Sequence, residues 1–202
     1  SFIFFLLSGL ASVVVVVAGK QGGAALFPAI FVFGDSTVDP GNNDYIATLF
    51  RGDHPPYGQN FPGKAATGRC SDGKLIPDIL ASMFGIKESI PPFLDPNLSD
   101  EEIVTGVSFA SAGSGYDEMT TAISLAIEIS KQVEYFKVYI SRLEGIVGKG
   151  EAAGILKDSL VIISSGTNDF VFNFYDIPTR RAHFDIDKYQ DFLLNKLTNI
   201  LQ

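Results

Sequence analysis

The stretch that decides the fold is Ala29-Ile30-Phe31-Val32-Phe33-Gly34-Asp35-Ser36-Thr37-Val38-Asp39-Pro40-Gly41-Asn42-Asn43, in which an apolar run breaks abruptly into Gly, Asp, Ser and Asn. The run from Ala29 to Phe33 is typical of a strand that is buried on both faces of a parallel sheet. The polar residues after it can face a ligand, because binding crevices in open α/β sheets lie outside the carboxyl ends of the strands. Ser36 is therefore predicted to be the chemical centre of the protein.

Two later stretches repeat this pattern of an apolar strand closed by small polar residues. Gly106 to Ala110 leads into Ser111-Ala112-Gly113-Ser114-Gly115, and Leu160 to Ser164 leads into Ser165-Gly166-Thr167-Asn168-Asp169. Helical patterns between the strands indicate βαβ units with right-handed crossovers and a parallel sheet. The carboxyl ends of parallel strands share one edge, so we expect Ser36, Gly113 and Asn168 to lie close together.

The connecting segments carry the periodicity of amphipathic helices. In the first of them Asp72 is the predicted N-cap, Pro77 falls in the first turn and Gly85 ends the helix. The second is predicted to stop near Gly145. The stretch 41–73 is rich in Gly, Pro, Asn and Asp and indicates a long ordered loop. The four predicted helices cover residues 74–84, 130–143, 151–157 and 187–201.

Composition narrows the class of protein. The 202 residues suit one α/β domain, and the formal charge of −8 without a basic cluster argues against nucleic-acid binding. Cys70 is the only cysteine, so no internal disulfide can form, and no Cys/His cluster has zinc-ligand spacing. We expect no metal and no cofactor, and the pattern assigns no oligomeric state.

The N-terminal segment from Phe2 to Ala18 is almost continuously apolar and is followed by small residues up to Ala25. This is typical of a targeting segment, and we interpret residues 1–25 as a cleaved signal peptide before a domain of residues 26–202. An uncleaved anchor is the alternative, and it would be the only contact with a membrane. In a secreted chain the sequon Asn97-Leu98-Ser99 makes Asn97 a glycosylation candidate.

The three strand-end residues suit nucleophilic chemistry. A serine acts as a nucleophile when a base takes its proton and donors stabilise the oxyanion that forms. Backbone N–H groups of Ser36 and Gly113 and the side-chain amide of Asn168 are candidate donors. Taken singly, each residue is more typical of a cap or a turn. The Gly-x-Ser-x-Gly elbow does not occur around Ser36, and phosphate- and dinucleotide-binding glycine motifs are absent.

Five motifs follow one another along the chain: Phe33-Gly34-Asp35-Ser36, Asp39-Pro40-Gly41-Asn42-Asn43, Gly68-Arg69-Cys70-Ser71-Asp72-Gly73-Lys74, Phe109-Ala110-Ser111-Ala112-Gly113-Ser114-Gly115 and Gly166-Thr167-Asn168-Asp169. In this order they resemble the motifs of plant-type GDSL esterases/lipases of the SGNH hydrolase superfamily, and the resemblance runs from about Phe27 to the C-terminus. The resemblance implies a three-layer α/β/α, flavodoxin-like sandwich and a secreted hydrolase that acts on small-molecule or lipid esters. It also implies that Ser36 is nucleophile and oxyanion donor, Gly113 the second donor and Asn168 the third, with Gly115 an alternative alignment for Gly113.

The chain departs from this family in one respect that bears on catalysis. The family's C-terminal Asp-x-x-His, which supplies the base, does not occur, and neither His54 nor His183 has an Asp three residues before it. The parallel sheet is therefore expected to be incomplete, with residues 160–164 forming an unpaired apolar edge. We expect no ordinary esterase turnover from these residues. The alternative hypothesis is a non-catalytic secreted protein that binds an acyl or glycan ligand.

Overall fold

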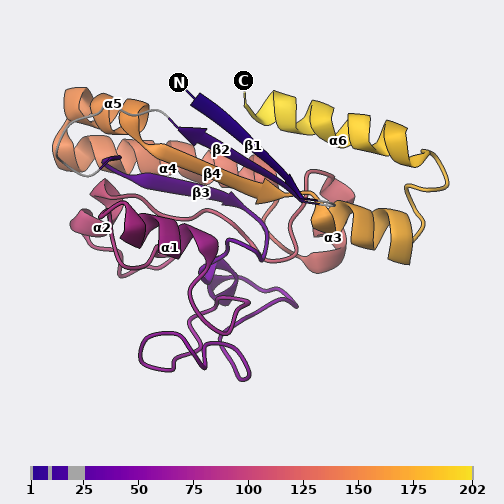
Figure 1. The fold of residues 1–202 in the computed structure, drawn as a ribbon, viewed down its shortest axis with the longest axis horizontal. Coiled ribbons are helices and arrows are strands. Elements are labelled where there is room, and N and C mark those ends of the chain that lie inside the picture. Colours follow the sequence, from indigo (N-terminus) through magenta and orange to yellow (C-terminus); the bar gives the residue numbers. More distant parts are fainter. Residues whose placement is uncertain (1, 9–10, 18–25, 202) are drawn as a thin grey trace.

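The computed structural model describes residues 2–8, 11–17 and 26–201, and it is an α/β fold in which helices flank a sheet (Figure 1). Its strands are β1 (Phe2–Ser8), β2 (Ala11–Val17), β3 (Ile30–Gly34) and β4 (Leu160–Ser165). Its α-helices are α1 (Ile76–Met83), α2 (Asp100–Val104), α3 (Glu118–Ser124), α4 (Ile129–Val147), α5 (Lys149–Asp158) and α6 (Ile186–Ile200). A 3-10 helix, η1 (Asn42–Tyr45), and a π-helix, η2 (Asp169–Asp176), follow β3 and β4.

The centre of the sheet is the parallel pair β3 and β4, with Gly34 opposite Ser164. On the other side of β3 runs the segment predicted as a strand over 106–110. Val32 N–H donates to Val107 O at 3.2 Å, and Phe109 N–H donates to Val32 O at 2.7 Å. This segment contributes isolated bridges from Ser108 to Val32 and to Pro92 instead of a full strand. Gly106, with φ of +94°, bends the chain at its start, so the extended stretch is short.

Alternate residues of β3 bury against opposite layers. Phe31 packs against Phe136 and Tyr139 of α4, with ring centroids 5.3 and 5.2 Å away. Val32 points to the opposite side of the sheet, where it belongs to a hydrophobic cluster with Ala81 of α1 and Ile162 of β4. Figure 1 accordingly shows α1 and α4 on opposite faces of the sheet. Burial on both faces explains why the β3 sequence is apolar throughout.

The outer edge of β4 differs from the expectation. The prediction that residues 160–164 form an unpaired edge is wrong, because β2 pairs with β4 in antiparallel register from Val17↔Leu160 to Ser12↔Ser165. β1 pairs with β2 in turn, so the sheet order is β1-β2-β4-β3 and the sheet is mixed. The apolar run that forms β2 therefore satisfies the free backbone groups of β4, and β1 in turn pairs with β2.

The predicted signal-peptidase region at residues 18–25 lies outside the described residues. Within the part of the chain that is described, no helix has the length and apolar character needed to cross a membrane.

The start of α1 and the end of α4 differ from the ends predicted from the sequence. Leu75, not Asp72, is the N-cap of α1, because the carboxylate of Asp78 accepts the Leu75 N–H at 2.8 Å and closes the first turn from within the helix. α4 continues past Gly145 to Val147 and ends at Gly148, whose φ is +83°. Pro77 lies in the first turn of α1, as predicted.

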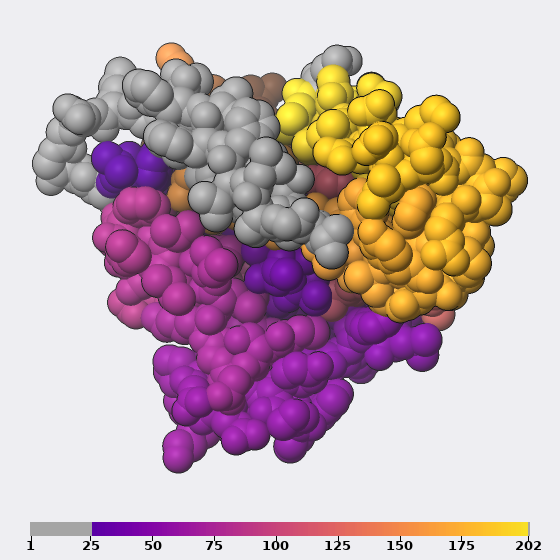
Figure 2. Space-filling model, turned by 45° about the vertical axis from the view of Figure 1, so that its right-hand side comes forward, coloured from indigo at the N-terminus to yellow at the C-terminus, as the bar shows by residue number. Residues whose placement is uncertain are grey.

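Arg69 anchors the long loop after η1, which forms the violet lobe at the bottom of Figures 1 and 2. Its guanidinium makes two 2.8 Å bonds to the Asp78 carboxylate on α1, and Nη2 also donates to Ile90 O at 2.8 Å. Nη1 contacts Pro40 O at 3.3 Å. Both partners of the ion pair are buried. Arg69 therefore ties the loop to α1 and to the turn beyond β3.

We predict that Arg69→Ala lowers the free energy of unfolding by about 3–5 kcal/mol, because it leaves the buried Asp78 carboxylate without its partner. Chemical denaturation followed by circular dichroism measures this loss. Lys74→Ala is the matched control, since Lys74 is half-buried but its partner Glu88 is exposed, and removal of this pair should leave the unfolding midpoint nearly unchanged. Equal midpoints for wild type and Arg69→Ala would contradict the assignment of Arg69 as an anchor.

Candidate active site

Gly34 joins the elements that carry the site. Its carbonyl oxygen accepts from Ser111 N–H at 2.9 Å, from the Ser114 hydroxyl at 3.0 Å and from Gln132 Nε2 at 2.9 Å. Its N–H donates to Gln132 Oε1 at 2.9 Å. With φ of +140°, a Cβ at this position would lie 1.9 Å from Ser164 O. A glycine is therefore required where β3 meets its neighbours.

Ser36 lies two residues beyond β3 in a turn closed by Val38 N–H donating to Asp35 O at 3.1 Å. The Asp35 carboxylate accepts from the Thr37 N–H and hydroxyl at 3.0 and 2.7 Å, and the Thr37 hydroxyl also contacts Ser164 Oγ at 2.8 Å. Ser36 is half-buried, and among the described residues no hydrogen bond engages its hydroxyl. Its side chain is therefore available to a ligand.

Gly113 lies in the turn after the 106–110 segment, with φ of +88°. A Cβ there would come within 2.8 Å of Ser124 Cβ, so the turn needs glycine. Its N–H engages in none of the hydrogen bonds found in the described part of the chain, and it can serve a ligand as a donor. At Gly115 a Cβ would lie 2.2 Å from Asp169 Oδ1, so packing against a carboxylate already accounts for that glycine. This geometry favours Gly113 over Gly115 as the candidate donor.

Asn168 is the residue immediately before η2. Its side-chain amide donates to Ser114 O at 2.9 Å, so it reaches the turn that contains Gly113. An amide nitrogen has two protons, and the second can serve another acceptor. The ends of β3, of the 106–110 segment and of β4 thus converge, with Ser36, Gly113 and Asn168 carried by hydrogen-bonded neighbours. Their catalytic roles stay predictions.

The side chains of Asp39, Asn42 and Asn43 hold the backbone of the turn that contains Gly113. The Asp39 carboxylate accepts from the N–H groups of Gly41 and Asn42 at 2.8 and 2.7 Å and from Ala112 N–H at 2.8 Å. Asn42 Nδ2 donates to Ser108 O at 2.9 Å and to Ala110 O at 2.8 Å, while Asn43 Nδ2 donates to Ala112 O at 2.9 Å. These three side chains therefore fix the backbone that presents Gly113.

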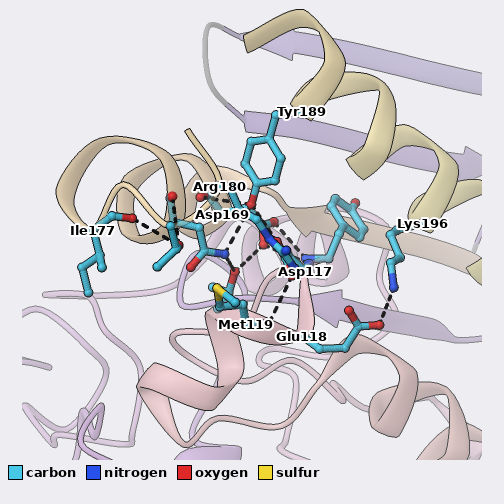
Figure 3. A network of polar contacts seen from close by, with 12 residues as sticks. Asp117, Glu118, Met119, Asp169, Ile177, Arg180, Tyr189 and Lys196 are labelled. Atoms are coloured by element: carbon cyan, nitrogen blue, oxygen red, sulfur yellow. Dashed lines mark hydrogen bonds and ion pairs between the residues drawn. The ribbon is translucent and has the colours of Figure 1, made fainter. Parts of the chain in front are cut away.

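Asp169 clamps the same turn from the β4 side (Figure 3). Its carboxylate accepts from Tyr116 N–H at 2.9 Å, from Asp117 N–H at 3.0 Å and from the Thr120 hydroxyl at 2.5 Å. Asp117 forms two bonds with Arg180, at 2.7 and 2.8 Å, and accepts from the Tyr189 hydroxyl at 3.1 Å. The network connects the turn with η2 and α6. Sequence reasoning missed its long-range partners, because Arg180 and Tyr189 belong to no motif.

Burial shifts the pKa of several groups around the site. Desolvation raises the pKa of Asp39 and of Asp169 to about 6, against the hydrogen bonds that favour their charged forms. Burial, with smaller contributions from Asp39 and Asp44, raises the pKa of the half-buried Cys70 thiol to about 11. Cys70 is therefore protonated at neutral pH and is a poor nucleophile.

Both histidines make their hydrogen bonds to residues other than Ser36 in the described part of the chain. His54 is exposed, and its Nδ1 lies 2.9 Å from Pro55 O. His183 is exposed in a turn after η2, where its N–H donates to Arg180 O at 2.9 Å. In the described ranges no hydrogen bond joins either histidine to Ser36. Those ranges also contain no group of three or more His, Cys, Asp or Glu side chains that could hold a metal ion.

We predict that replacing Asp169 by Asn changes how stability depends on pH. The folded protein binds the Asp169 proton more tightly than the unfolded chain, because burial raises the pKa from 3.8 to about 6. This group therefore favours folding below about pH 4, and the contribution is lost as the pH rises to about 6. The unfolding free energy of wild type should fall relative to Asp169→Asn by up to about 3 kcal/mol between pH 4 and 7. Urea titrations at several pH values measure this difference. The exposed Asp191→Asn is the control for charge removal, and a difference independent of pH would contradict the prediction.

Comparison with known proteins identifies the family of this chain. Residues 30–198 match the family described as GDSL-like Lipase/Acylhydrolase. The chain is 56% identical over 178 residues to GDSL esterase/lipase At1g06990 of Arabidopsis thaliana, which covers 88% of this chain and 49% of the relative. It is 55% identical over 179 residues to GDSL esterase/lipase At2g31550 of the same plant, covering 88% of this chain and 50% of that relative. A third relative, GDSL esterase/lipase At2g30310, is 53% identical over 188 residues, or 92% of this chain and 52% of its own length.

No solved structure matches the chain. The chain spans about half the length of the relatives it matches. The match over residues 30–198 includes Ser36, Gly113 and Asn168. The chain belongs to the GDSL-like lipase/acylhydrolase family.

Proposed function

We propose that this chain carries the nucleophile and the oxyanion hole of a serine hydrolase of carboxylic esters. Three neighbouring strand ends are tied together by the Gly34 and Asn168 hydrogen bonds, and this convergence is the observation that carries the proposal. The family's relatives are named esterase/lipase, in agreement with ester substrates.

In this reaction the Ser36 Oγ attacks the acyl carbon and gives its proton to a base. The negative charge that develops on the carbonyl oxygen is bound by the N–H groups of Ser36 and Gly113 and by the Asn168 amide. Collapse of the tetrahedral intermediate breaks the ester bond, and the base returns the proton to the leaving alcohol. Water then attacks the acyl-enzyme and releases the carboxylic acid.

The base is the element that these residues do not supply. No Asp-x-x-His occurs in the sequence, and His54 and His183 make their contacts away from Ser36. We therefore propose that the chain alone does not turn esters over at an ordinary rate. This observation also favours a second candidate function, non-catalytic binding of an acyl or glycan ligand in the same crevice.

We predict that the chain hydrolyses p-nitrophenyl acetate no faster than its Ser36→Ala variant in plain buffer, and that added imidazole restores a Ser36-dependent rate. Imidazole is small enough to act as an external base for a half-buried hydroxyl. Asn168→Ala should lower the restored rate about 100- to 1,000-fold, because it removes one oxyanion donor. Release of nitrophenolate, followed by absorbance, measures all three proteins.

The Ser36→Ala protein is the control for hydrolysis by imidazole itself. Ser36-dependent turnover without imidazole would overturn the proposed lack of a base. Equal rates for wild type and Ser36→Ala at every imidazole concentration would contradict the proposed hydrolysis and leave ligand binding as the candidate function.

We also propose that the chain is secreted, with residues 1–25 as a signal peptide and Asn97 as a glycosylation site. Asn97 is exposed in a turn where its N–H donates to Asp95 Oδ1 at 2.9 Å. Ser99, the third residue of the sequon, caps α2 and accepts from Glu102 N–H at 3.2 Å. An exposed turn is accessible to a glycosyltransferase.

We predict that expression in plant or insect cells releases a protein whose N-terminus lies near Ala25 and whose mass falls on treatment with a peptide N-glycosidase. N-terminal sequencing and mass spectrometry check both statements. Asn97→Gln should abolish the change in mass without altering the N-terminus. A membrane-bound product that retains Phe2 would show that the segment is an anchor.

A further inference from the structure

Tyr116 carries a buried hydroxyl that has no hydrogen-bond partner among the described residues. The residue is only 7% exposed. A buried tyrosine hydroxyl usually finds a partner, as Tyr139 does by donating to Ile103 O at 2.6 Å. An unmade bond in a buried site costs free energy, and nothing in the described protein offsets this cost for Tyr116.

The ring of Tyr116 lies at the end of β4. A Cβ on Gly166 would be 3.5 Å from Tyr116 Cε2, so the ring covers that glycine. Because Gly34 pairs with Ser164 in the parallel register, Ser36 and Gly166 occupy corresponding positions beyond the ends of adjacent strands. The aromatic ring therefore lies beside the strand end that neighbours Ser36.

The backbone of Tyr116 is held firmly within the candidate site. Its N–H donates to Asp169 Oδ2 at 2.9 Å, and the preceding Ser114 carbonyl accepts from the Asn168 amide at 2.9 Å. The hydroxyl is thus presented by the same turn that presents Gly113. Its position does not depend on a mobile loop tip.

Tyr116 also borders open space. Together with Gly115 it lines a cavity of about 620 Å³ whose other walls come from α3, α4 and α6 and are both apolar, as at Val133 and Ile200, and charged, as at Glu118 and Lys196. This volume lies within the range of small-molecule pockets. Ser36, Gly113 and Asn168 do not line this cavity, so Tyr116 is the residue that lies both on its wall and beside the strand end next to Ser36.

We propose that Tyr116 is a further substrate-binding residue, whose hydroxyl donates a hydrogen bond to an oxygen of the carboxylic ester bound at Ser36. This inference rests on the function proposed above. Burial first, and then the charges of Asp169 and Asp35, raise the pKa of Tyr116, so the phenol keeps its proton and acts as a donor at neutral pH. If the ring served only for packing, phenylalanine would serve equally well.

Butylboronic acid tests the proposal without requiring turnover. Its boron accepts the Ser36 Oγ, an Oγ–B bond forms and the serine proton passes to solvent, which leaves an anionic tetrahedral adduct with two hydroxyl groups. These groups stand for the oxyanion and for the oxygen of the leaving alcohol. ¹¹B nuclear magnetic resonance detects the tetrahedral boron, and isothermal titration calorimetry gives the dissociation constant.

We expect Tyr116→Phe to raise the dissociation constant of the Ser36-dependent adduct about tenfold while the melting temperature stays the same or increases. Tyr139→Phe is the matched control with the opposite pattern, a lower melting temperature and an unchanged dissociation constant. Equal affinities of wild type and Tyr116→Phe, or a marked loss of stability in that variant, would overturn the proposed role of Tyr116. The proposed function of Ser36 would not be affected by either result. If wild type forms no more adduct than Ser36→Ala, the proposed function fails, and the role of Tyr116 fails with it.

Discussion

The site depends on the hydrogen bonds made by the Gly34 peptide. At the last residue of β3, one carbonyl oxygen receives donors from the Ser111 backbone, the Ser114 side chain and Gln132 of α4. Neighbouring parallel strands and a crossover helix therefore meet at a single peptide group. Because a side chain there would collide with Ser164 O, the absence of a Cβ makes this junction possible. The direction in which the chain leaves β3, and thus the place of Ser36, follows from it.

Buried carboxylates organise the rest of the site by binding backbone N–H groups. Asp39 holds Ala112, Asp169 holds Tyr116 and Asp117, and Asp78 holds Leu75 and Ile90. Each removes a charged group from water, which is costly unless the charge is well paired. Asp78 has Arg69 as its partner, whereas Asp39 and Asp169 rely on hydrogen bonds and have raised pKa values. These carboxylates therefore fix the backbone of the site, and the raised pKa values of Asp39 and Asp169 show that their burial has a desolvation cost.

Much of this architecture could be predicted from local patterns. The apolar run at 29–33 indicated β3, the period of 3.6 residues indicated α4 and α6, and the repeated strand endings predicted that Ser36, Gly113 and Asn168 would converge. The pairing of β2 with β4 could not be predicted in this way, because an apolar run of that length also suits a targeting segment. The hydrogen-bond network around Asp169 could not be predicted from the sequence either. Its partners are separated by 49 to 53 positions in sequence, and their spacing carries no periodic signal.

The two asparagines after Ser36 have a consequence for how this site can vary in evolution. Asn42 and Asn43 bind the carbonyl oxygens of residues 108, 110 and 112, which every amino acid possesses. The side-chain amide nitrogens thus bind the main chain, whatever residue stands there, and the only side chain that this support uses is Ser111, whose hydroxyl donates to Asn43 Oδ1 at 2.5 Å. Residues 108–112 are themselves buried, so changes that reshape the surroundings of a ligand have to arise outside this segment, while the support for the Gly113 turn is inherited unchanged. Ligand specificity can then change around the site while the backbone that carries Gly113 keeps the same support.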